Sequence, residues 1–272
     1  MDDTEMAGAD HDAALGTVYL VGSGPGDPEL LTVKARRLLE EADYVLHDRL
    51  PGPRIIDLLP ADRSEDVGKR AHGDSTPQSE INERLVELAR DGNDVVRLKG
   101  GDSFVFGRGG EEAEYLAANG IPFEVVPAVT SAIAAPGVAG IPVTHRDHAS
   151  TVSIVTGHED PTKAESAVNW EALARTGGTI VVLMGVTRLP QYTTALEEAG
   201  MAPDTPVAMV ERATWPNQQV ATGTIETITE VRDEVGIEPP AVTVIGEVAA
   251  TRESVVAFLQ NDYGDRVETP AQ

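Results

Sequence analysis

The first half of the chain alternates short apolar runs with stretches of helical periodicity. Runs of three to five mostly β-branched or aliphatic residues are typical of strands buried on both faces of a sheet. We predict strands at residues 17–21, 44–46, 95–98 and 123–126, and a short helix and strand within 57–67. Five strands alternating with helices predict a parallel sheet that is complete by about Pro127.

Helices are predicted between these strands. Asp27 suits an N-cap and Pro28 a first helical residue, so the first helix should begin there and continue to about Glu41. Further helices are predicted at residues 77–90 and 111–119, where apolar residues recur every three or four positions.

The second half is patterned less regularly. Strands are predicted at residues 152–155, 179–184, 206–210, 218–222 and 241–245. Helices are predicted at residues 170–174, 189–198 and 226–235, with a closing helix or strand-edge segment within 248–259. Because helices do not separate every pair of strands here, we predict a mixed sheet. The fold class is therefore α/β, with two α/β domains.

Composition changes between these halves. Residues 128–150 are small, punctuated by Gly and Pro and nearly free of acids, so we place the inter-domain connection there as a short helix and a loop. Crevices between domains commonly bind ligands, and we expect the active site in the cleft that this connection lines. The expected division is a frayed acidic arm at 1–15, an N-terminal domain at 16–128, the connection at 129–150, a C-terminal domain at 151–260 and a tail at 261–272.

The net charge of the chain limits the environment and the partners that we expect for it. The 272 residues include 45 acidic and 21 basic ones, for a net charge of −24, and only four of the basic residues are lysines. Excess carboxylate with scarce lysine is typical of a protein adapted to high salt, where screening removes self-repulsion; an ordinary acidic cytosolic protein is the alternative. A surface this negative repels nucleic acid and anionic membranes, so we expect neither as a partner.

The chain contains no cysteine, which excludes disulfides, thiolate metal sites and cysteine nucleophiles. His145 and His148 lie three positions apart beside Asp147 and could be considered metal ligands. A third strong ligand at suitable spacing is missing, so we expect no metal. The first twelve residues carry five acids and no base, unlike a signal peptide. No apolar run reaches the roughly 18 residues of a membrane span, and we expect a soluble, cytoplasmic protein.

Residues 94–112 carry the clearest signal of a binding loop. An apolar strand ends at Gly100 and Gly101, and five of the residues from 100 to 110 are glycine. Paired glycines allow positive φ and close approach of a ligand to the main chain. Asp102 follows at the strand's C-terminal end, where open α/β sheets bind ligands, and could accept hydrogen bonds from hydroxyls or amines. An ordinary strand-to-helix turn is the alternative.

The turn after the first strand supports a different hypothesis. Its glycines follow the pattern G-x-G-x-G at residues 22–26, and Asp48 lies about 20 residues further on, where a dinucleotide-binding protein has its ribose-binding acid. The spacing differs from G-x-G-x-x-G, and Pro25 stiffens the turn. An NAD-dependent Rossmann oxidoreductase is therefore an alternative with less support, and a rigid turn is the plain interpretation.

Read together, seven segments give the chain a family resemblance. They occur in family order and are VYLVGSGPGDPELLTVKA (18–35), YVLHDRL (44–50), VGKRAH (67–72), VVRLKGGDSFVFGRGGEE (95–112), GIPFEVVPAVTSA (120–132), GIPVTHRD (140–147) and LMG (183–185). On these residues the chain resembles the tetrapyrrole methylases, and among them most closely the uroporphyrinogen-III C-methyltransferases. The resemblance covers roughly residues 17–260.

The resemblance implies two α/β domains, a homodimer and S-adenosylmethionine (SAM) bound in the cleft. Two methyl groups would pass from two SAM molecules to uroporphyrinogen III, through a monomethylated intermediate, to give precorrin-2 and S-adenosylhomocysteine. Precorrin-2 is the branch point to sirohaem and cobalamin. By motif, the implied cofactor-binding residues are Pro25, Gly100, Gly101, Asp102, Val105, Thr130, Ser131, Met184 and Ala213.

The same motifs imply catalytic and substrate-binding residues. Asp48 matches the family's proposed proton acceptor and Lys69 its proposed donor. The substrate is a polycarboxylate, so an acidic protein must gather cations at its site, and guanidinium groups suit carboxylates. The loop cations that fit are Arg49, Arg70, Arg108 and Arg146, each of which could instead be a solvated charge paired with a neighbouring acid.

Four positions depart from the family pattern. Ser103 stands where proline is usual, Ala128 and Ala213 where glycine is usual, and His47 where tyrosine is frequent beside the proposed base. These changes bear on loop rigidity and on the basicity of Asp48. The alternatives that stay open are a methyltransferase acting on a later precorrin, the NAD-dependent enzyme and a non-catalytic tetrapyrrole carrier.

Overall fold

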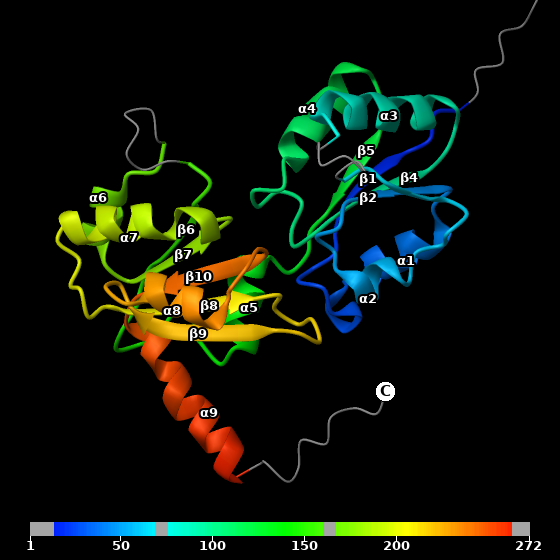
Figure 1. Ribbon diagram of the computed structural model, residues 1–272. Helices are drawn as coiled ribbons and strands as arrows, with labels where there is room; N and C mark the ends of the chain where they lie inside the picture. Colours follow the sequence, from blue (N-terminus) through cyan, green and yellow to red (C-terminus); the bar gives the residue numbers. More distant parts are fainter. Residues whose placement is uncertain (1–13, 69–75, 160–166, 263–272) are drawn as a thin grey trace, which may run out of the picture. The chain divides into compact units, whose positions relative to one another are not determined.

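The computed structural model describes residues 14–68, 76–159 and 167–262, with the backbone alone for residues 257–262 (Figure 1). The chain forms two compact units. The first holds the described residues up to Ser23 together with residues 31–51 and 56–128. The second holds residues 24–30, 52–55 and the described residues from Val129 onward. Two short segments that follow the first two strands therefore pack with the second unit.

The first unit is built on a five-stranded sheet of order β3-β2-β4-β1-β5. All of its neighbouring strands are parallel, as the sequence predicted. The strands are β1 (Val18–Gly22), β2 (Tyr44–His47), β3 (Ser64–Asp66), β4 (Val95–Lys99) and β5 (Phe123–Val126). β4 is buried along its whole length, and β1 at four of its five residues, because each has a neighbour on both sides and helices on the faces.

Helices on both faces complete this unit. They are α1 (Val33–Glu41), α3 (Gln78–Arg90) and α4 (Gly109–Ala118), whereas α2 (Pro53–Ile56) falls mostly within residues 52–55 of the second unit. Figure 1 shows α3 and α4 on one face of the sheet and α1 on the other. Leu85 of α3 and Leu116 of α4 are fully buried against Leu20 and Leu46 of the sheet. The apolar face of each helix thus covers the apolar side chains of the strands.

Two predicted helix starts are wrong. Residues Pro28–Leu30 form only a 3₁₀ turn, and α1 begins after Thr32, whose hydroxyl oxygen accepts a hydrogen bond from the Ala35 N–H at 3.1 Å. Thr32 has an extended backbone and so interrupts the helix that Asp27 and Pro28 would have begun. The short helix expected within 57–67 lies earlier, in α2, where proline at the first helical position is favourable.

The second unit contains the predicted mixed sheet, in the order β6-β7-β10-β8-β9. β6 and β7 are parallel, and the other neighbours are antiparallel. The strands are β6 (Val152–Thr156), β7 (Thr179–Leu183), β8 (Pro206–Glu211), β9 (Gln219–Thr224) and β10 (Ala241–Ile245). The helices are α5 (Ser131–Val138), α6 (Trp170–Thr176), α7 (Leu189–Glu198), α8 (Ile228–Val235) and α9 (Thr251–Asp262).

The core of the second unit centres on aromatic and aliphatic side chains. Trp170 of α6 stacks on Tyr192 of α7 with ring centroids 5.3 Å apart, and the Tyr192 hydroxyl contacts the Thr243 hydroxyl of β10 at 3.0 Å. Burial raises the pKa of Tyr192, so its hydroxyl stays protonated. The short helix predicted in the connection is α5, which packs against β7 and β10. No helix within the described ranges is long and apolar enough to cross a membrane.

Candidate active site

The glycine-rich loop after β4 (residues 100–108) is fixed to the end of β1. The two strands are parallel neighbours, with Gly22 opposite Lys99. A Cβ atom on Gly22 would lie 2.5 Å from the Gly101 carbonyl oxygen, so only glycine allows this approach. Gly101 itself has a φ of 67°. The positive φ that the paired glycines allow is therefore present at Gly101, and the binding role of the loop stays a prediction.

Asp102 has a main-chain role that the sequence did not predict. Its Oδ1 accepts a hydrogen bond from the Phe104 N–H, and its Oδ2 accepts one from the Ala128 N–H, both at 2.9 Å. The carboxylate therefore ties the loop to the segment after β5. Each carboxylate oxygen can accept a second hydrogen bond, so Asp102 keeps the capacity to bind a ligand hydroxyl or amine.

Asp102→Asn should therefore loosen the loop. The amide keeps one acceptor oxygen, but its NH₂ group cannot accept the second main-chain hydrogen bond, and one N–H is left unsatisfied. We expect the free energy of unfolding to fall by about 1–3 kcal/mol and the affinity for S-adenosylhomocysteine to weaken. Denaturant unfolding and calorimetric titration measure both, with Asp91→Asn at an exposed helix end as the control. Unchanged affinity in Asp102→Asn would count against the loop as cofactor site.

The rest of the loop presents apolar rings and a cation. Phe104 is 52% exposed and Phe106 is 45% exposed, and Phe106 and Arg108 have positive φ angles of 54° and 60°. Non-glycine residues in this region are strained and concentrate at functional sites. Arg108 forms two hydrogen bonds with the Glu111 carboxylate, at 3.0 and 2.7 Å. Val105 lies between the two rings in the chain and is partly buried.

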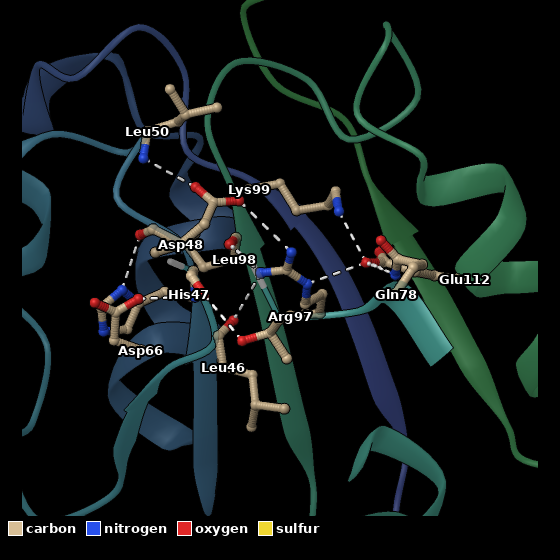
Figure 2. A network of polar contacts seen from close by, with 12 residues as sticks. Leu46, His47, Asp48, Leu50, Asp66, Gln78, Arg97, Leu98, Lys99 and Glu112 are labelled. Atoms are coloured by element: carbon tan, nitrogen blue, oxygen red, sulfur yellow. Dashed lines mark hydrogen bonds and ion pairs between the residues drawn. The ribbon is translucent and has the colours of Figure 1, made fainter. Parts of the chain in front are cut away.

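Asp48 lies directly after β2, with one side-chain oxygen anchored on each side (Figure 2). Oδ1 accepts a hydrogen bond from the Leu50 N–H at 2.9 Å, and Oδ2 lies 3.5 Å from Nη2 of Arg97. The side chain is 24% exposed, so the carboxylate is held but still accessible. His47, one of the four residues that depart from the family pattern, is buried. Its Nδ1 lies 2.9 Å from the Asp48 carbonyl oxygen.

A buried ion cluster lies behind Asp48, formed by Arg97, Lys99 and Glu112, and the partly buried Gln78 is bonded to it (Figure 2). Oε1 of Glu112 accepts hydrogen bonds from Nζ of Lys99 at 2.8 Å, from Nε2 of Gln78 at 3.0 Å and from Nε of Arg97 at 3.1 Å. The Glu112 side chain is fully buried. Sequence analysis did not identify this cluster. The feature that could have indicated it is the pair of cations, Arg97 and Lys99, at alternate positions of a strand predicted to be buried.

The cluster holds two cations on one buried carboxylate. Burial, and then the positive charge of Arg97, lower the pKa of Lys99, while Glu112 opposes both effects. Buried charges are stable only when they are paired and hydrogen-bonded. Glu112 is thus the anion that allows Arg97 and Lys99 to remain inside the sheet.

Among the described residues, the cations predicted to bind the substrate are more exposed than Arg97 and Lys99. Arg49 donates from Nε to Oδ2 of Asp66 at 3.0 Å, and Oδ1 of Asp66 accepts from the Gly68 N–H at 2.9 Å. Desolvation alone would raise the pKa of Asp66, but the hydrogen bonds from Gly68 and Arg49 lower it. Arg146 is exposed, in the turn after His145. The predictions for Lys69 and Arg70 lie outside the described residues.

The second unit holds the remaining predicted cofactor residues. The main-chain carbonyl of Pro25 accepts a hydrogen bond from Nε1 of Trp215 at 3.1 Å. The Trp215 ring also covers Gly52, where a Cβ atom would approach it to 2.8 Å. Trp215 therefore fixes both short segments that follow β1 and β2, and it lies two residues after Ala213.

Two of the predicted cofactor residues, Met184 and Ala213, lie at one edge of the second sheet. β10 is antiparallel to both β7 and β8, so these two strands run in the same direction, and Val242 lies opposite both Leu183 and Val210. Met184 and Ala213 follow the two strand ends at this edge. Met184 has a φ of 56° and is 52% exposed.

Thr130 and Ser131 begin α5. The Thr130 hydroxyl caps the helix by accepting from the Ala132 N–H at 3.3 Å. Of the nine predicted cofactor residues, the structure places the four of the loop after β4 in the first unit and the other five in the second. All nine lie at strand ends, helix starts or the loops that join them.

Comparison with known proteins yields a consistent set of relatives. The family model described as Tetrapyrrole (Corrin/Porphyrin) Methylases matches residues 17–229. The S-adenosyl-L-methionine-dependent uroporphyrinogen III methyltransferase of Methanosarcina barkeri is 57% identical over 86% of this chain and 92% of its own length. The sirohaem synthase of Thiobacillus denitrificans is 44% identical over 94% of this chain, which spans 53% of that relative.

Solved structures agree with these relatives. The uroporphyrin-III C-methyltransferase of Thermus thermophilus in complex with S-adenosylhomocysteine superposes with a TM-score of 0.74 at 43% identity, over 86% of this chain and 99% of that one. A cobalt precorrin-4 methyltransferase has a TM-score of 0.77 at 29% identity, over 86% of this chain and 95% of that one.

Proposed function

Because the chain belongs to the tetrapyrrole (corrin/porphyrin) methylases, we propose that it transfers two methyl groups from two SAM molecules to uroporphyrinogen III and forms precorrin-2. The observation that carries this proposal is 57% identity to a uroporphyrinogen III methyltransferase over 92% of that relative's length. The Thermus thermophilus structure adds a relative that holds the demethylated cofactor.

The residues of this chain suit SAM. The cofactor supplies an electrophilic methyl group on a sulfonium, together with ribose hydroxyls and an amino group. Asp102 offers acceptor oxygens, Thr130 and Ser131 offer hydroxyls, and Val105 and Met184 offer apolar surface next to exposed main chain. The predicted set contains a single carboxylate, which suits a cationic cofactor with several hydrogen-bond donors.

We assign the proton acceptor role to Asp48 and the donor role to Lys69. Methylation of a ring carbon must be accompanied by loss of a proton from the ring system, and a carboxylate held at a strand end can take it. The anchoring of Asp48 by Leu50 and Arg97 supports this assignment, because a general base must keep its position relative to the substrate.

The cations assigned to substrate binding are Arg49, Arg70, Arg108 and Arg146. The ion pairs of Arg49 with Asp66 and of Arg108 with Glu111 are largely exposed. Exposed pairs contribute at most about 1 kcal/mol, so either arginine can exchange its protein partner for a carboxylate of the substrate. Guanidinium groups suit this exchange because they bind carboxylates through two parallel hydrogen bonds.

The strongest rival is a methyltransferase that acts on a later precorrin. The likeness to a cobalt precorrin-4 methyltransferase shows that the fold alone does not separate the two activities, but its 29% identity is well below the 57% and 43% of the uroporphyrinogen enzymes. Purified protein should be incubated anaerobically with SAM and uroporphyrinogen III, and the product weighed. Two added methyl groups are the expected result; an unchanged mass would reject the proposal.

We also propose that the chain forms a homodimer, as the family resemblance implies. We expect light scattering to give twice the mass of one 28.8 kDa chain. The mass of a monomer would contradict this proposal.

We further propose that the protein is adapted to high salt. The excess of 24 negative charges repels itself, and this repulsion falls when the screening length shrinks to ~3 Å at molar salt. The midpoint of thermal unfolding should therefore rise between dilute and molar KCl, and a midpoint that does not change with salt would contradict the proposal.

A further inference from the structure

Arg97 connects the proposed base to the interior of the sheet. All three nitrogens of its guanidinium group have acceptors (Figure 2). Nε donates to Glu112 at 3.1 Å, Nη1 donates to the Leu98 and Leu46 carbonyl oxygens at 3.1 and 3.4 Å, and Nη2 lies 3.5 Å from Oδ2 of Asp48. Its side chain is only 3% exposed. The group is therefore locked in one orientation by three contacts that do not involve Asp48.

Charge balance links Asp48 to this cluster. Arg97 and Lys99 contribute two positive charges, and Glu112 contributes one negative charge. The Asp48 carboxylate supplies the second negative charge, so these four side chains together carry no net charge. Because buried cations are stable only when they are paired, this balance favours the ion pair between Arg97 and Asp48.

We propose that Arg97 is a positioning residue for the reaction: with Glu112 behind it, its guanidinium group holds the carboxylate of Asp48 in a fixed orientation at the end of β2. Asp48 would touch the substrate, whereas Arg97 acts through Asp48. The inference rests on the proposed role of Asp48 as proton acceptor. It explains why two cations lie in a strand that is otherwise apolar.

Asp48 follows β2, whose neighbours in the sheet are β3 and β4. Within the described residues, the charged and titratable side chains toward the C-terminal ends of these strands are Arg97 and Lys99 on β4, Asp66 on β3, and His47 and Arg49 beside Asp48 in the chain. Arg49 is occupied by Asp66, and Lys99 is directed at Glu112. Arg97 is thus the cation whose ion pair reaches the Asp48 carboxylate.

Arg97→Met and Lys99→Met form a matched pair for the test. Each removes one buried cation and leaves Glu112 with the other one, but only Arg97 pairs with Asp48. The full-length variants should be assayed with SAM and uroporphyrinogen III for kcat and for the KM of each substrate. Calorimetric titration with S-adenosylhomocysteine and hydrogen exchange check that each variant is folded.

For Arg97→Met we expect kcat to fall about 10–100-fold, because the base is no longer oriented, while KM for SAM stays within about twofold. Lys99→Met should lose comparable stability with a smaller change in kcat.

Two outcomes would overturn the inference. One is a wild-type kcat in Arg97→Met; the other is an equal or larger fall of kcat in Lys99→Met. Asp48→Asn separates these results from a failure of the proposed mechanism. If Asp48→Asn turns over like the wild type, the role of Asp48 itself is rejected. If it is inactive while Arg97→Met is normal, only the positioning role fails.

Discussion

Asp48→Asn is expected to lower the rate of methyl transfer by about 10²–10⁴-fold, the range that a positioned general base contributes. Asparagine has nearly the same shape, and its amide oxygen can still accept the hydrogen bond from the Leu50 N–H. It cannot accept a proton from the ring system. Since the Asp48 side chain pairs with the Leu50 N–H and with Arg97 rather than with the loop after β4, the affinity for S-adenosylhomocysteine should change little.

Initial rates with both substrates and calorimetric titration measure these two effects separately. Asp62→Asn, an exposed residue of the same unit, is the matched control and should behave as wild type in both measurements. Wild-type turnover in Asp48→Asn would remove this residue as the proton acceptor. Equal losses of turnover and cofactor affinity would indicate a structural role instead.

Glu112→Leu is expected to lower the free energy of unfolding by about 3–5 kcal/mol, because it leaves two buried cations without their shared carboxylate. Leucine is apolar and of similar size, so the effect comes from the lost charge and hydrogen bonds. Three donors, on Gln78, Arg97 and Lys99, lose their acceptor at once. Denaturant unfolding followed by hydrogen exchange should place the loss in peptides from α3 and β4.

The neighbouring residue gives the control. Glu111→Leu removes a carboxylate from the same helix turn, but its ion pair with Arg108 is more than half exposed and should cost less than about 1 kcal/mol. If Glu112→Leu does not fold, Glu112→Gln keeps the shape and one acceptor oxygen and should show a smaller loss. Losses of the same size for Glu111→Leu and Glu112→Gln would contradict the account of the cluster.

Most strands could be predicted because they carry short apolar runs, often of β-branched residues, between helical stretches; β3 (Ser64–Asp66) carries none. The parallel first sheet and the mixed second sheet followed from the spacing of those runs. The start of α1 could not be placed, because Asp27 and Thr32 are both good N-caps and local propensity does not choose between them. The choice depends on tertiary packing, since residues 24–30 pack with the second unit.

The candidate site was predictable where a motif lies in one stretch of chain, as in the loop from Gly100 to Arg108. Contacts between distant residues were not. The bond from the Ala128 N–H to Asp102 spans 26 positions, and its existence depends on β1 lying between β4 and β5. The buried ion cluster was missed because the strand was predicted from Val95, Val96 and Leu98, and the charge of Arg97 did not enter that prediction. Two cations in that strand required a buried carboxylate, but the sequence does not say that Glu112 supplies it.

We expect the loop after β4 to bind the methyl donor at the C-terminal edge of the first sheet. A crystal structure with S-adenosylhomocysteine would show where the donor lies. The ligand should contact the main chain of Gly100 and Gly101 and the carboxylate of Asp102. An ordered ligand bound away from all three residues would contradict it.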